Sequence, residues 1–170
     1  MSARHVVLPS PIGELTVVAE DGALTHLLMD AAKYRPADPD VLGEKASPDE
    51  EPFAAAALQL RAYFAGELHD FDLPLAPRGD EFQLRVWALL RAIPYGETRS
   101  YGDLAAALGD RNLAQAVGTA NGRNPIAVVI PCHRVIGRDG SLVGYAGGLH
   151  RKRFLLTLEE PSADHAGRLF

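Results

Sequence analysis

The pattern of apolar and polar positions predicts a small β-sheet at the start of the chain. Residues 4–8, 14–19 and 23–29 are rich in β-branched and aliphatic side chains, and short polar stretches separate them. An Asp-Gly pair at residues 21–22 is a typical hairpin turn. We therefore expect three strands, followed by a loop over residues 30–47, where aspartate, proline and alanine dominate.

The period of the apolar positions changes from two to about 3.6 after this loop, which indicates a helix. Residues 47–51 place acidic side chains near its start, where the helix dipole favours negative charge. The helix is expected to end at Gly66. Its core-facing side is expected to consist of Phe53, Ala57, Leu60 and Phe64.

The second half of the chain predicts several helices. Residues 72–80 form a connecting segment, and a helix capped by Asp80 follows and ends at residues 93–96. Two short helices are expected over residues 101–108 and 112–121, joined by a glycine turn. This pair is typical of a helix-turn-helix, although an ordinary αα-hairpin in a helical domain has the same pattern.

The order of these elements predicts an α+β fold with two domains. Residues 1–76 would form a small α/β domain, residues 77–160 a mostly helical domain, and residues 161–170 a loose tail. The length of 170 residues and the apolar fraction of 47% are sufficient for a real core. No apolar run approaches the roughly 20 residues that span a bilayer, and the start lacks the apolar segment of a signal peptide. We expect a cytoplasmic protein that has no membrane partner.

The charge is unevenly distributed along the chain. The net charge is −5, yet residues 1–80 carry 6 basic and 14 acidic side chains, whereas residues 81–170 carry 11 basic and 8 acidic ones. Ten of those eleven cations are arginines, which contact phosphates and bases better than lysines do. Arg111 and Arg123 flank the second helix of the predicted pair and could reach phosphates. Charge alone leaves both nucleic-acid binding and ordinary surface solvation open.

The only cysteine of the chain, Cys132, is the main candidate for chemistry. A single thiol cannot form an internal disulfide and provides too few ligands for a structural zinc site. It could be a buried filler, a surface thiol or a nucleophile. The apolar run at residues 126–130 predicts a buried strand, and Pro131 ends it directly before Cys132 and His133. Reactive groups often lie where a strand ends, so this position favours a nucleophile.

Several runs around this cysteine together resemble one protein family, the O(6)-alkylguanine-DNA alkyltransferases, also called methylated-DNA–protein-cysteine methyltransferases. The similarity is strong over residues 80–160 and looser before them, and the run around Cys132 is the most specific. The matching runs are Ile93-Pro94-Tyr95-Gly96-Glu97-Thr98, Ser100-Tyr101, Ala116-Val117-Gly118, Asn124-Pro125, Ile130-Pro131-Cys132-His133-Arg134-Val135, and Gly144-Tyr145 with Gly147-Gly148.

The resemblance implies a fold and a partner. The fold would combine a small ribonuclease-H-like α/β N-terminal domain with a mostly helical, winged-helix-like C-terminal domain that contains the helix-turn-helix. The second helix of that motif would enter the minor groove of double-stranded DNA that carries O(6)-alkylguanine. The target nucleotide would have to leave the duplex, because its reactive atom is buried in the base stack.

The resemblance also assigns the reaction to Cys132, which would attack the alkyl carbon and keep it as a stable thioether, so that each molecule acts once. The nucleophile must be a thiolate, and only about 3% of a free thiol of pKa ~8.5 is ionised at pH 7. His133 would activate the thiol through a water molecule, because neighbouring side chains in an extended segment point apart. Without the resemblance, the alternative for His133 is a surface or capping histidine.

Three further residues match the family's catalytic positions. Glu159 would hydrogen-bond the histidine; it follows a helix expected over residues 149–158, at an end where the dipole disfavours acids. Asn124 would tie the active-site turn to the helix-turn-helix. Tyr101 would donate to the departing base and promote flipping. The alternatives are an exposed helix end for Glu159, a turn residue for Asn124 and a half-buried core tyrosine for Tyr101.

The remaining assignments concern DNA and the base. Backbone groups of Cys132, Val135 and Ala146 would contact the flipped guanine, with Pro131 and Tyr145 as pocket walls. Gln115 occupies the position where the family usually has an arginine that fills the gap in the duplex. Glutamine lacks the charge and the stacking plane of a guanidinium, so we expect weaker duplex binding or flipping. The cluster Arg151, Lys152 and Arg153 is expected to be a solvated helix face.

The sequence thus predicts a monomeric, single-turnover methyltransferase that repairs DNA without a cofactor or a metal ion. Three rivals remain. A non-catalytic alkylguanine lesion-binding protein would flip the base without repairing it, although such proteins lack the cysteine. A cysteine hydrolase would need a base directly against the thiol, which adjacent Cys132 and His133 fit poorly. A DNA-binding regulator would use only the helix-turn-helix.

Overall fold

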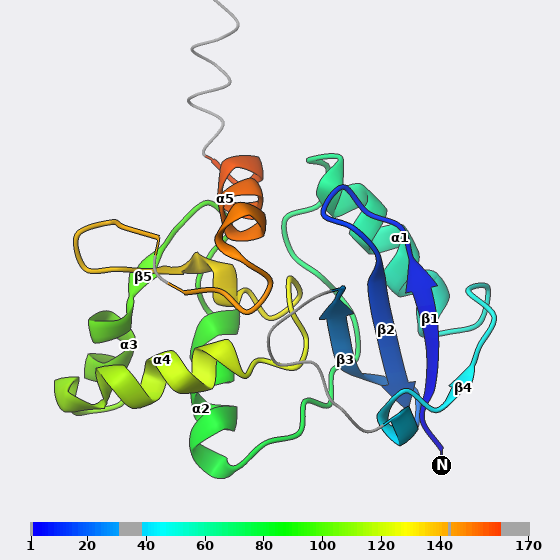
Figure 1. The fold of residues 1–170 in the computed structure, drawn as a ribbon, viewed down its shortest axis with the longest axis horizontal. Helices are drawn as coiled ribbons and strands as arrows, with labels where there is room; N and C mark the ends of the chain where they lie inside the picture. The colour runs from blue at the N-terminus through cyan, green and yellow to red at the C-terminus, as the bar shows by residue number, and fades with distance from the viewer. Residues whose placement is uncertain (1, 31–38, 143, 161–170) are drawn as a thin grey trace, which may run out of the picture.

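The computed structural model describes residues 2–30, 39–142 and 144–160. The expected tail at residues 161–170 and part of the expected loop therefore lie outside the described residues. Figure 1 shows two halves side by side, with a sheet and the helix α1 in one and the helices α2 to α5 in the other. The expected α+β architecture is confirmed.

The N-terminal half contains a four-stranded sheet in the order β3-β2-β1-β4. The three expected strands are present as β1 (Arg4–Leu8), β2 (Leu15–Glu20) and β3 (Ala23–Met29), and neighbouring pairs are antiparallel. A 3-10 turn (Pro39–Val41) and the short strand β4 (Glu44–Lys45), which pairs parallel to β1, lie where only loop was expected. Two residues are too short a run to give a strand pattern in the sequence.

The helix α1 (Phe53–Phe64) begins later than its acidic run suggested. Residues 48–52 form turns, and the Glu51 carboxylate accepts a hydrogen bond from the backbone N–H of Ala55. The buried face also differs by one position at two places, since Ala56 and Tyr63 are buried where Ala57 and Phe64 were expected. The side chain of Tyr63 therefore points into the protein.

The C-terminal half begins with helix α2 (Glu81–Arg91), which has the expected cap at Asp80. The Asp80 side chain accepts from the backbone N–H of Gln83, and the Gln83 side chain accepts from the backbone N–H of Asp80, which forms a complete capping box. The indole N–H of Trp87 donates to the carbonyl of Ala120 at 2.8 Å and ties α2 to the helix α4. This contact holds α2 against α4 within the helical half.

The expected pair of short helices is present as α3 (Tyr101–Ala107) and α4 (Ala114–Gly122), with a 3-10 turn (Arg111–Leu113) between them. Ser100 caps α3 and accepts from the backbone N–H of Asp103. The two helices pack against each other and against the turn that connects them. This is the arrangement that a helix-turn-helix requires.

The rest of the C-terminal half consists of short strands and one helix. The two-residue strands β5 (Arg99–Ser100) and β6 (Val135–Ile136) pair in parallel. A 3-10 turn (Cys132–Arg134) directly precedes β6. The last helix, α5 (Leu149–Leu158), has the expected bounds.

The strand expected at residues 126–130 is wrong. These residues form a tight turn in which Val128 has a φ of 71°, and only Ile126 makes an isolated bridge, to Leu27 of β3. The backbone N–H of Leu27 donates to the carbonyl of Pro125, and the N–H of Ala127 donates to the carbonyl of Leu27. The run is apolar because β3 and the helical half enclose it, not because it belongs to a sheet.

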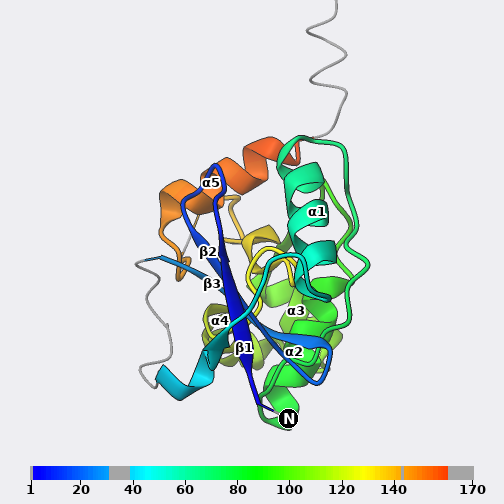
Figure 2. The same cartoon turned by 90° about the vertical axis from the view of Figure 1, so that its right-hand side faces the viewer.

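A single apolar core extends through both halves of the molecule. The strand β3 links them, because it also pairs with the segment between α1 and α2: the N–H of Leu24 donates to the carbonyl of Pro74, and the N–H of Ala76 donates to the carbonyl of Leu24. Figure 2 shows α5 crossing one end of the molecule, next to the end of α1. Within the described residues, no helix is long and apolar enough to cross a membrane.

Candidate active site

The thiol of Cys132 lies at the wall of a cavity between the two halves. Cys132 is 6% exposed and begins the 3-10 turn that follows the buried turn at residues 126–130. Asn124 holds this arrangement from the end of α4: its side-chain amide donates to the carbonyl of Ile130 at 2.7 Å and accepts from the N–H of Ile126 at 3.0 Å. The amide thus brackets the turn that carries the thiol.

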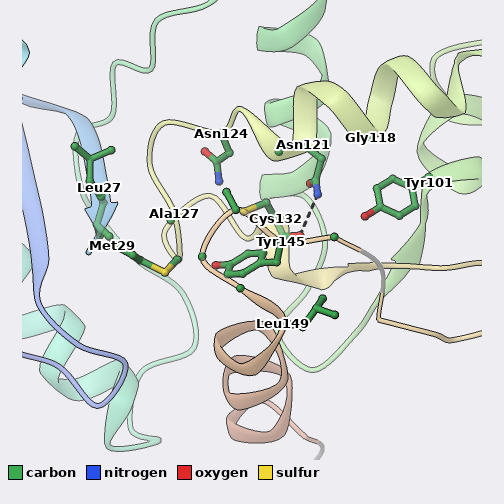
Figure 3. A pocket seen from close by; sticks show the side chains of 16 residues that line it. Leu27, Met29, Tyr101, Gly118, Asn121, Asn124, Ala127, Cys132, Tyr145 and Leu149 are labelled. Carbon is green, nitrogen blue, oxygen red and sulfur yellow. Dashed lines mark hydrogen bonds between the residues drawn. The ribbon is translucent and has the colours of Figure 1, made fainter. Parts of the chain in front are cut away.

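The cavity has a volume of about 430 Å³. Figure 3 shows that β3, α4, the loop before α5 and Tyr101 of α3 each contribute a wall. A cavity of this size accommodates a small molecule or a single base. Its lining comprises Leu27, Leu28, Met29, Tyr101, Gly118, Asn121, Gly122, Asn124, Ala127, Cys132, Gly144, Tyr145, Ala146, Gly147, Gly148 and Leu149.

Two buried polar atoms near the thiol have no hydrogen-bond partner among the described residues. They are Oδ1 of Asn121 and Nδ1 of His133. Asn121 and Tyr145 also line the cavity, and the Asn121 amide donates a long hydrogen bond of 3.4 Å to the carbonyl of Cys132. Buried polar groups are normally satisfied in a folded protein. Unsatisfied groups at a cavity therefore point to a polar ligand.

The thiol of Cys132 is protonated in the folded protein. Burial raises the pKa of Cys132, and the amide of Asn124, the charge of Lys152 and the hydroxyl of Tyr145 offset this rise only in part. Cys132 is therefore not held as a thiolate before the reaction. The proton must leave the thiol when the substrate is bound, which requires a base close to Cys132.

His133 is suited to be that base. Its imidazole is completely buried, and its Nε2 lies 2.7 Å from Oε2 of Glu159. Burial lowers the pKa of His133 more than Glu159 raises it, so the ring is neutral. Because the carboxylate can only accept, we assign the ring proton to Nε2, which leaves the unpartnered Nδ1 as the acceptor for a proton.

The turn brings Cys132 and His133 together in a different way from the expected one. The two residues lie in a 3-10 turn, so the extended segment assumed from the sequence is wrong. The expectation that His133 does not contact the thiol directly still agrees with the structure, because its Nδ1 makes no hydrogen bond to the thiol. A proton transfer between them needs an intermediate carrier or a small movement of the turn.

Glu159 is a buried carboxylate at the C-terminal end of α5. It is only 2% exposed, yet it accepts from His133, from Nε of Arg134 at 2.7 Å and from Nη2 of Arg134 at 3.0 Å. Burial alone would raise the pKa of Glu159, but the hydrogen bonds and charges of His133 and Arg134 outweigh it and lower the pKa to about 2. The carboxylate is therefore ionised at any working pH.

The expected solvated face of α5 is wrong for two of its three cations. Lys152 is fully buried, its ammonium group donates to the carbonyl of Gly144 at 3.2 Å, and burial lowers its pKa to about 8. Arg151 donates to the carbonyl of Ile12 at 3.0 Å and so joins α5 to the N-terminal half. Of the three, only Arg153 is exposed.

The other predicted residues divide between the cavity and the outer surface. Tyr101, Tyr145 and Ala146 line the cavity, and burial raises the pKa of Tyr101, which therefore remains a hydroxyl donor. Pro131 and Val135 are buried but do not line it.

Gln115, Arg111 and Arg123 are all exposed, the first in the opening turn of α4 and the other two beside that helix. Arg111 also lines a separate hollow at the start of α3, together with Arg138. All three side chains are therefore at the surface around α4. Among the described residues, no group of three or more His, Cys, Asp or Glu side chains could hold a metal ion.

Comparison with known proteins places residues 4–77 and 81–161 in one family. A family described as 6-O-methylguanine DNA methyltransferase, ribonuclease-like domain, matches residues 4–77, and one described as 6-O-methylguanine DNA methyltransferase, DNA binding domain, matches residues 81–161. The methylated-DNA–protein-cysteine methyltransferase of Mycolicibacterium paratuberculosis is 52% identical over 167 residues, which is 98% of each chain. This chain belongs to the methylated-DNA–protein-cysteine methyltransferase family.

Other members of the family agree in sequence and in structure. The methylated-DNA–protein-cysteine methyltransferase of Methanosarcina acetivorans is 48% identical and covers 91% of this chain and 97% of its own. The crystal structure of Mycobacterium tuberculosis OGT in complex with DNA is 50% identical, with a TM-score of 0.84 over 94% of this chain and 93% of that chain. The two-domain architecture of the methyltransferase family therefore holds for this protein.

Four residues of this methyltransferase site were missed by the sequence reasoning. Tyr63 donates its hydroxyl proton to Oε2 of Glu159, Arg134 forms the paired contact with the same carboxylate, and Lys152 and Asn121 lie near the thiol. Arg134 stood in the matching run without a role, and its place next to His133 was the one available signal. For the other three, nothing in the sequence indicated proximity to Cys132.

The buried groups of the site predict that this methyltransferase loses stability in acid. As the pH falls below 6.5, the ordinary pKa of histidine, the unfolded chain binds a proton that buried His133 resists. As it falls from 4.5 towards 2, the unfolded chain likewise protonates Glu159 first. Stability declines wherever the unfolded state binds more protons. We expect Glu159→Gln to flatten the fall between about pH 4.5 and pH 2.

The measurement is the free energy of unfolding by urea at a series of pH values. Glu160→Gln is the matched control, because Glu160 is the exposed neighbour of Glu159. It should keep the slope of the unsubstituted protein. Equal slopes for all three proteins would show that Glu159 does not control acid stability.

Proposed function

We propose that this protein reverses alkylation damage in DNA by moving the alkyl group, typically methyl, from O(6) of guanine to its own Cys132. The observation that carries the proposal is a buried single thiol at a base-sized cavity, with a neutral imidazole behind it whose Nδ1 is free to accept a proton. The family names, which describe methyl transfer from DNA to a protein cysteine, agree with this chemistry.

In the proposed reaction, the Sγ–carbon bond forms as the carbon–O(6) bond breaks. The thiol proton passes to Nδ1 of His133, and the resulting imidazolium is stabilised by the ionised Glu159 at 2.7 Å. The electron pair of the broken bond remains on guanine, which therefore needs a donor. The hydroxyl of Tyr101, at the cavity, is the proposed donor to the base.

The product thioether has no leaving group that water could replace under these conditions, so the proposed reaction consumes the protein. Asn124 is proposed to keep the turn that carries Cys132 in register with α4. Backbone groups of Cys132, Val135 and Ala146 are proposed to contact the flipped base, with Tyr145 as a wall of the cavity. Pro131 would support the turn from behind the cavity, since it does not line it.

The proposed partner is double-stranded DNA, with α4 in the minor groove. The exposed first turn of α4, with Arg111 before it and Arg123 after it, supports this placement. The M. tuberculosis structure, whose name states a complex with DNA, agrees with a DNA partner. We further propose that the protein acts as a cytoplasmic monomer, with residues 1–76 and 77–160 as its two domains.

The test is an intact mass after mixing with a duplex that carries O(6)-methylguanine. The proposal predicts a gain of one methyl group on Cys132, which saturates at one per protein chain. Tight binding to the duplex without any gain in mass would support the alternative, a lesion-binding protein that flips the base and does not repair it. Peptide mapping would identify the alkylated residue.

Gln115→Arg is expected to increase the repair of duplex DNA several-fold. Gln115 is exposed in the first turn of α4, and an arginine there would add a charge near phosphates and a flat group to fill the space of the flipped base. The measurement is the single-turnover rate on a modified duplex. The rate with the free base O(6)-benzylguanine should not change, because the free base needs no flipping.

Leu58→Arg is the control for added charge, since Leu58 is 64% exposed on α1 in the other half of the protein. It should leave both rates unchanged. If Gln115→Arg and Leu58→Arg repair the duplex at the same rate, the glutamine at position 115 does not limit flipping.

A further inference from the structure

Tyr63 connects the N-terminal half to the proposed base of the reaction. It belongs to the last turn of α1, is completely buried and donates its hydroxyl proton to Oε2 of Glu159. The same oxygen accepts from Nε2 of His133. We infer that Tyr63 is a positioning residue for alkyl transfer, which acts on His133 through Glu159. This inference rests on the proposed function.

The hydroxyl of Tyr63 is a fixed donor. Burial and the negative charge of Glu159 raise the pKa of Tyr63 far above its ordinary value, so the phenol keeps its proton. Its ring contacts that of Phe71, with centroids 5.2 Å apart, and that of Tyr95, with centroids 6.3 Å apart. Because the Tyr63 hydroxyl keeps its proton and its ring is buried against other aromatic rings, its hydrogen bond fixes the position of the Glu159 oxygen.

A neutral donor has an advantage at this place. His133 must become an imidazolium during the reaction, and the cations Arg134 and Lys152 oppose that charge. Arg134 already holds both oxygens of Glu159. A third cation would fix the carboxylate further but would make His133 a weaker base. The phenol of Tyr63 fixes it without adding positive charge.

Removal of the Tyr63 hydroxyl should change the pH dependence of alkyl transfer. The charged groups that act on His133 are Glu159 and Lys152 of the α5 segment, together with Arg134 of its own turn. Without Tyr63, the Glu159 oxygen shares its charge with one donor fewer and binds the proton of Nε2 more strongly. The imidazole then protonates at a higher pH, and a protonated imidazole cannot accept the thiol proton.

The experiment compares the unsubstituted protein, Tyr63→Phe and Tyr95→Phe. Tyr95 is the matched control, because its ring adjoins that of Tyr63 but its hydroxyl donates to the carbonyl of Leu158 instead of Glu159. For Tyr63→Phe we expect alkylation of Cys132 to slow about tenfold, the lower end of what is lost when the partner behind a metal-bound histidine is removed. The acidic limb of the pH–rate profile should move to higher pH. Tyr95→Phe should change neither.

A double-mutant cycle separates this role from a general effect on packing. If Tyr63 acts through Glu159, then Tyr63→Phe should have no further effect on the rate in a Glu159→Gln background. Equal rate losses in both backgrounds would overturn the inference. So would a Tyr63→Phe protein that matches the unsubstituted protein in rate and in pH profile.

Two further results complete the test. If the unsubstituted protein takes up no methyl group, the proposed function and the inference are both overturned; if it does while Tyr63→Phe reacts equally well, only the inference fails. A measurement without any variant covers the case in which Tyr63→Phe does not fold. The hydroxyl proton of Tyr63 should exchange slowly with solvent in the proton NMR spectrum, and fast exchange would overturn the inference.

Discussion

Cys132→Ser is expected to abolish the uptake of alkyl groups while it leaves the fold and the binding of DNA intact. Serine fills nearly the same space as cysteine, so the buried turn and the cavity wall should persist. Its hydroxyl, however, ionises at a far higher pH than a thiol. The thiol already depends on His133 to lose its proton, because burial raises the pKa of Cys132, and an alcohol in this position would remain protonated.

The measurement is intact mass after incubation with a methylated duplex, together with the dissociation constant for the same duplex. No mass gain and an unchanged dissociation constant are expected. Since Cys132 is the only cysteine in the sequence, a methyl group found on the serine variant would place the acceptor at another kind of residue. That result would contradict the proposed mechanism, whereas weaker binding alone would show that the thiol contributes to recognition.

Among the substitutions proposed for this protein, Arg134→Met is expected to lower the free energy of unfolding the most. Arg134 is 6% exposed, and it holds Glu159 with two hydrogen bonds and donates to the carbonyl of Ile93 at 2.6 Å. Without the guanidinium, an ionised carboxylate would remain buried without its cation. Removing one partner of a buried ion pair costs about 3–5 kcal/mol. For a domain of this size that corresponds to a fall in Tm of roughly 6–20 °C.

Urea unfolding of three variants tests this expectation. Arg78→Met is the control, because Arg78 forms an exposed ion pair with Glu20 whose loss should cost less than about 1 kcal/mol. The double variant Arg134→Met with Glu159→Gln should recover part of the loss, since no unpaired charge remains. Equal unfolding free energies for Arg78→Met and Arg134→Met would show that the buried pair contributes little.

The sequence predicted those parts of the fold that are determined locally. The hairpin strands β1 to β3 have their own turn residues and alternation, and the cap at Asp80 starts α2 where expected. The bounds of α5 also agreed. In each case the signal lies within a few residues of the element itself, so no distant part of the chain is needed to interpret it.

The errors arose where the other half of the protein determines the environment. Residues 126–130 have the composition of a strand, but they are buried between β3 and the helices as a turn, and composition reports burial rather than backbone shape. Lys152 resembles a surface residue in sequence, and it is buried only because α5 packs with that face inward. The face of α1 was misjudged for the same reason, which concealed Tyr63.

The candidate site was accessible to sequence reasoning mainly through one run and its family resemblance. Cys132 and His133 are adjacent in that run, but Glu159 lies 26 positions beyond His133, and only the resemblance connected them. The contact of Tyr63 with Glu159 spans 96 positions. No periodicity or spacing reports a hydrogen bond between side chains so far apart.

The strand β3 has a consequence for how such a chain can be divided or recombined. Its backbone pairs on one side with the turn before Cys132, and its residues Leu27, Leu28 and Met29 form a wall of the cavity. A fragment that begins at α2 would lack this wall and would expose the apolar turn at residues 126–130. Chimeras between relatives should therefore inherit β3 and this turn from the same parent. The two halves have separate folds, but the contact between β3 and this turn requires that they be exchanged together.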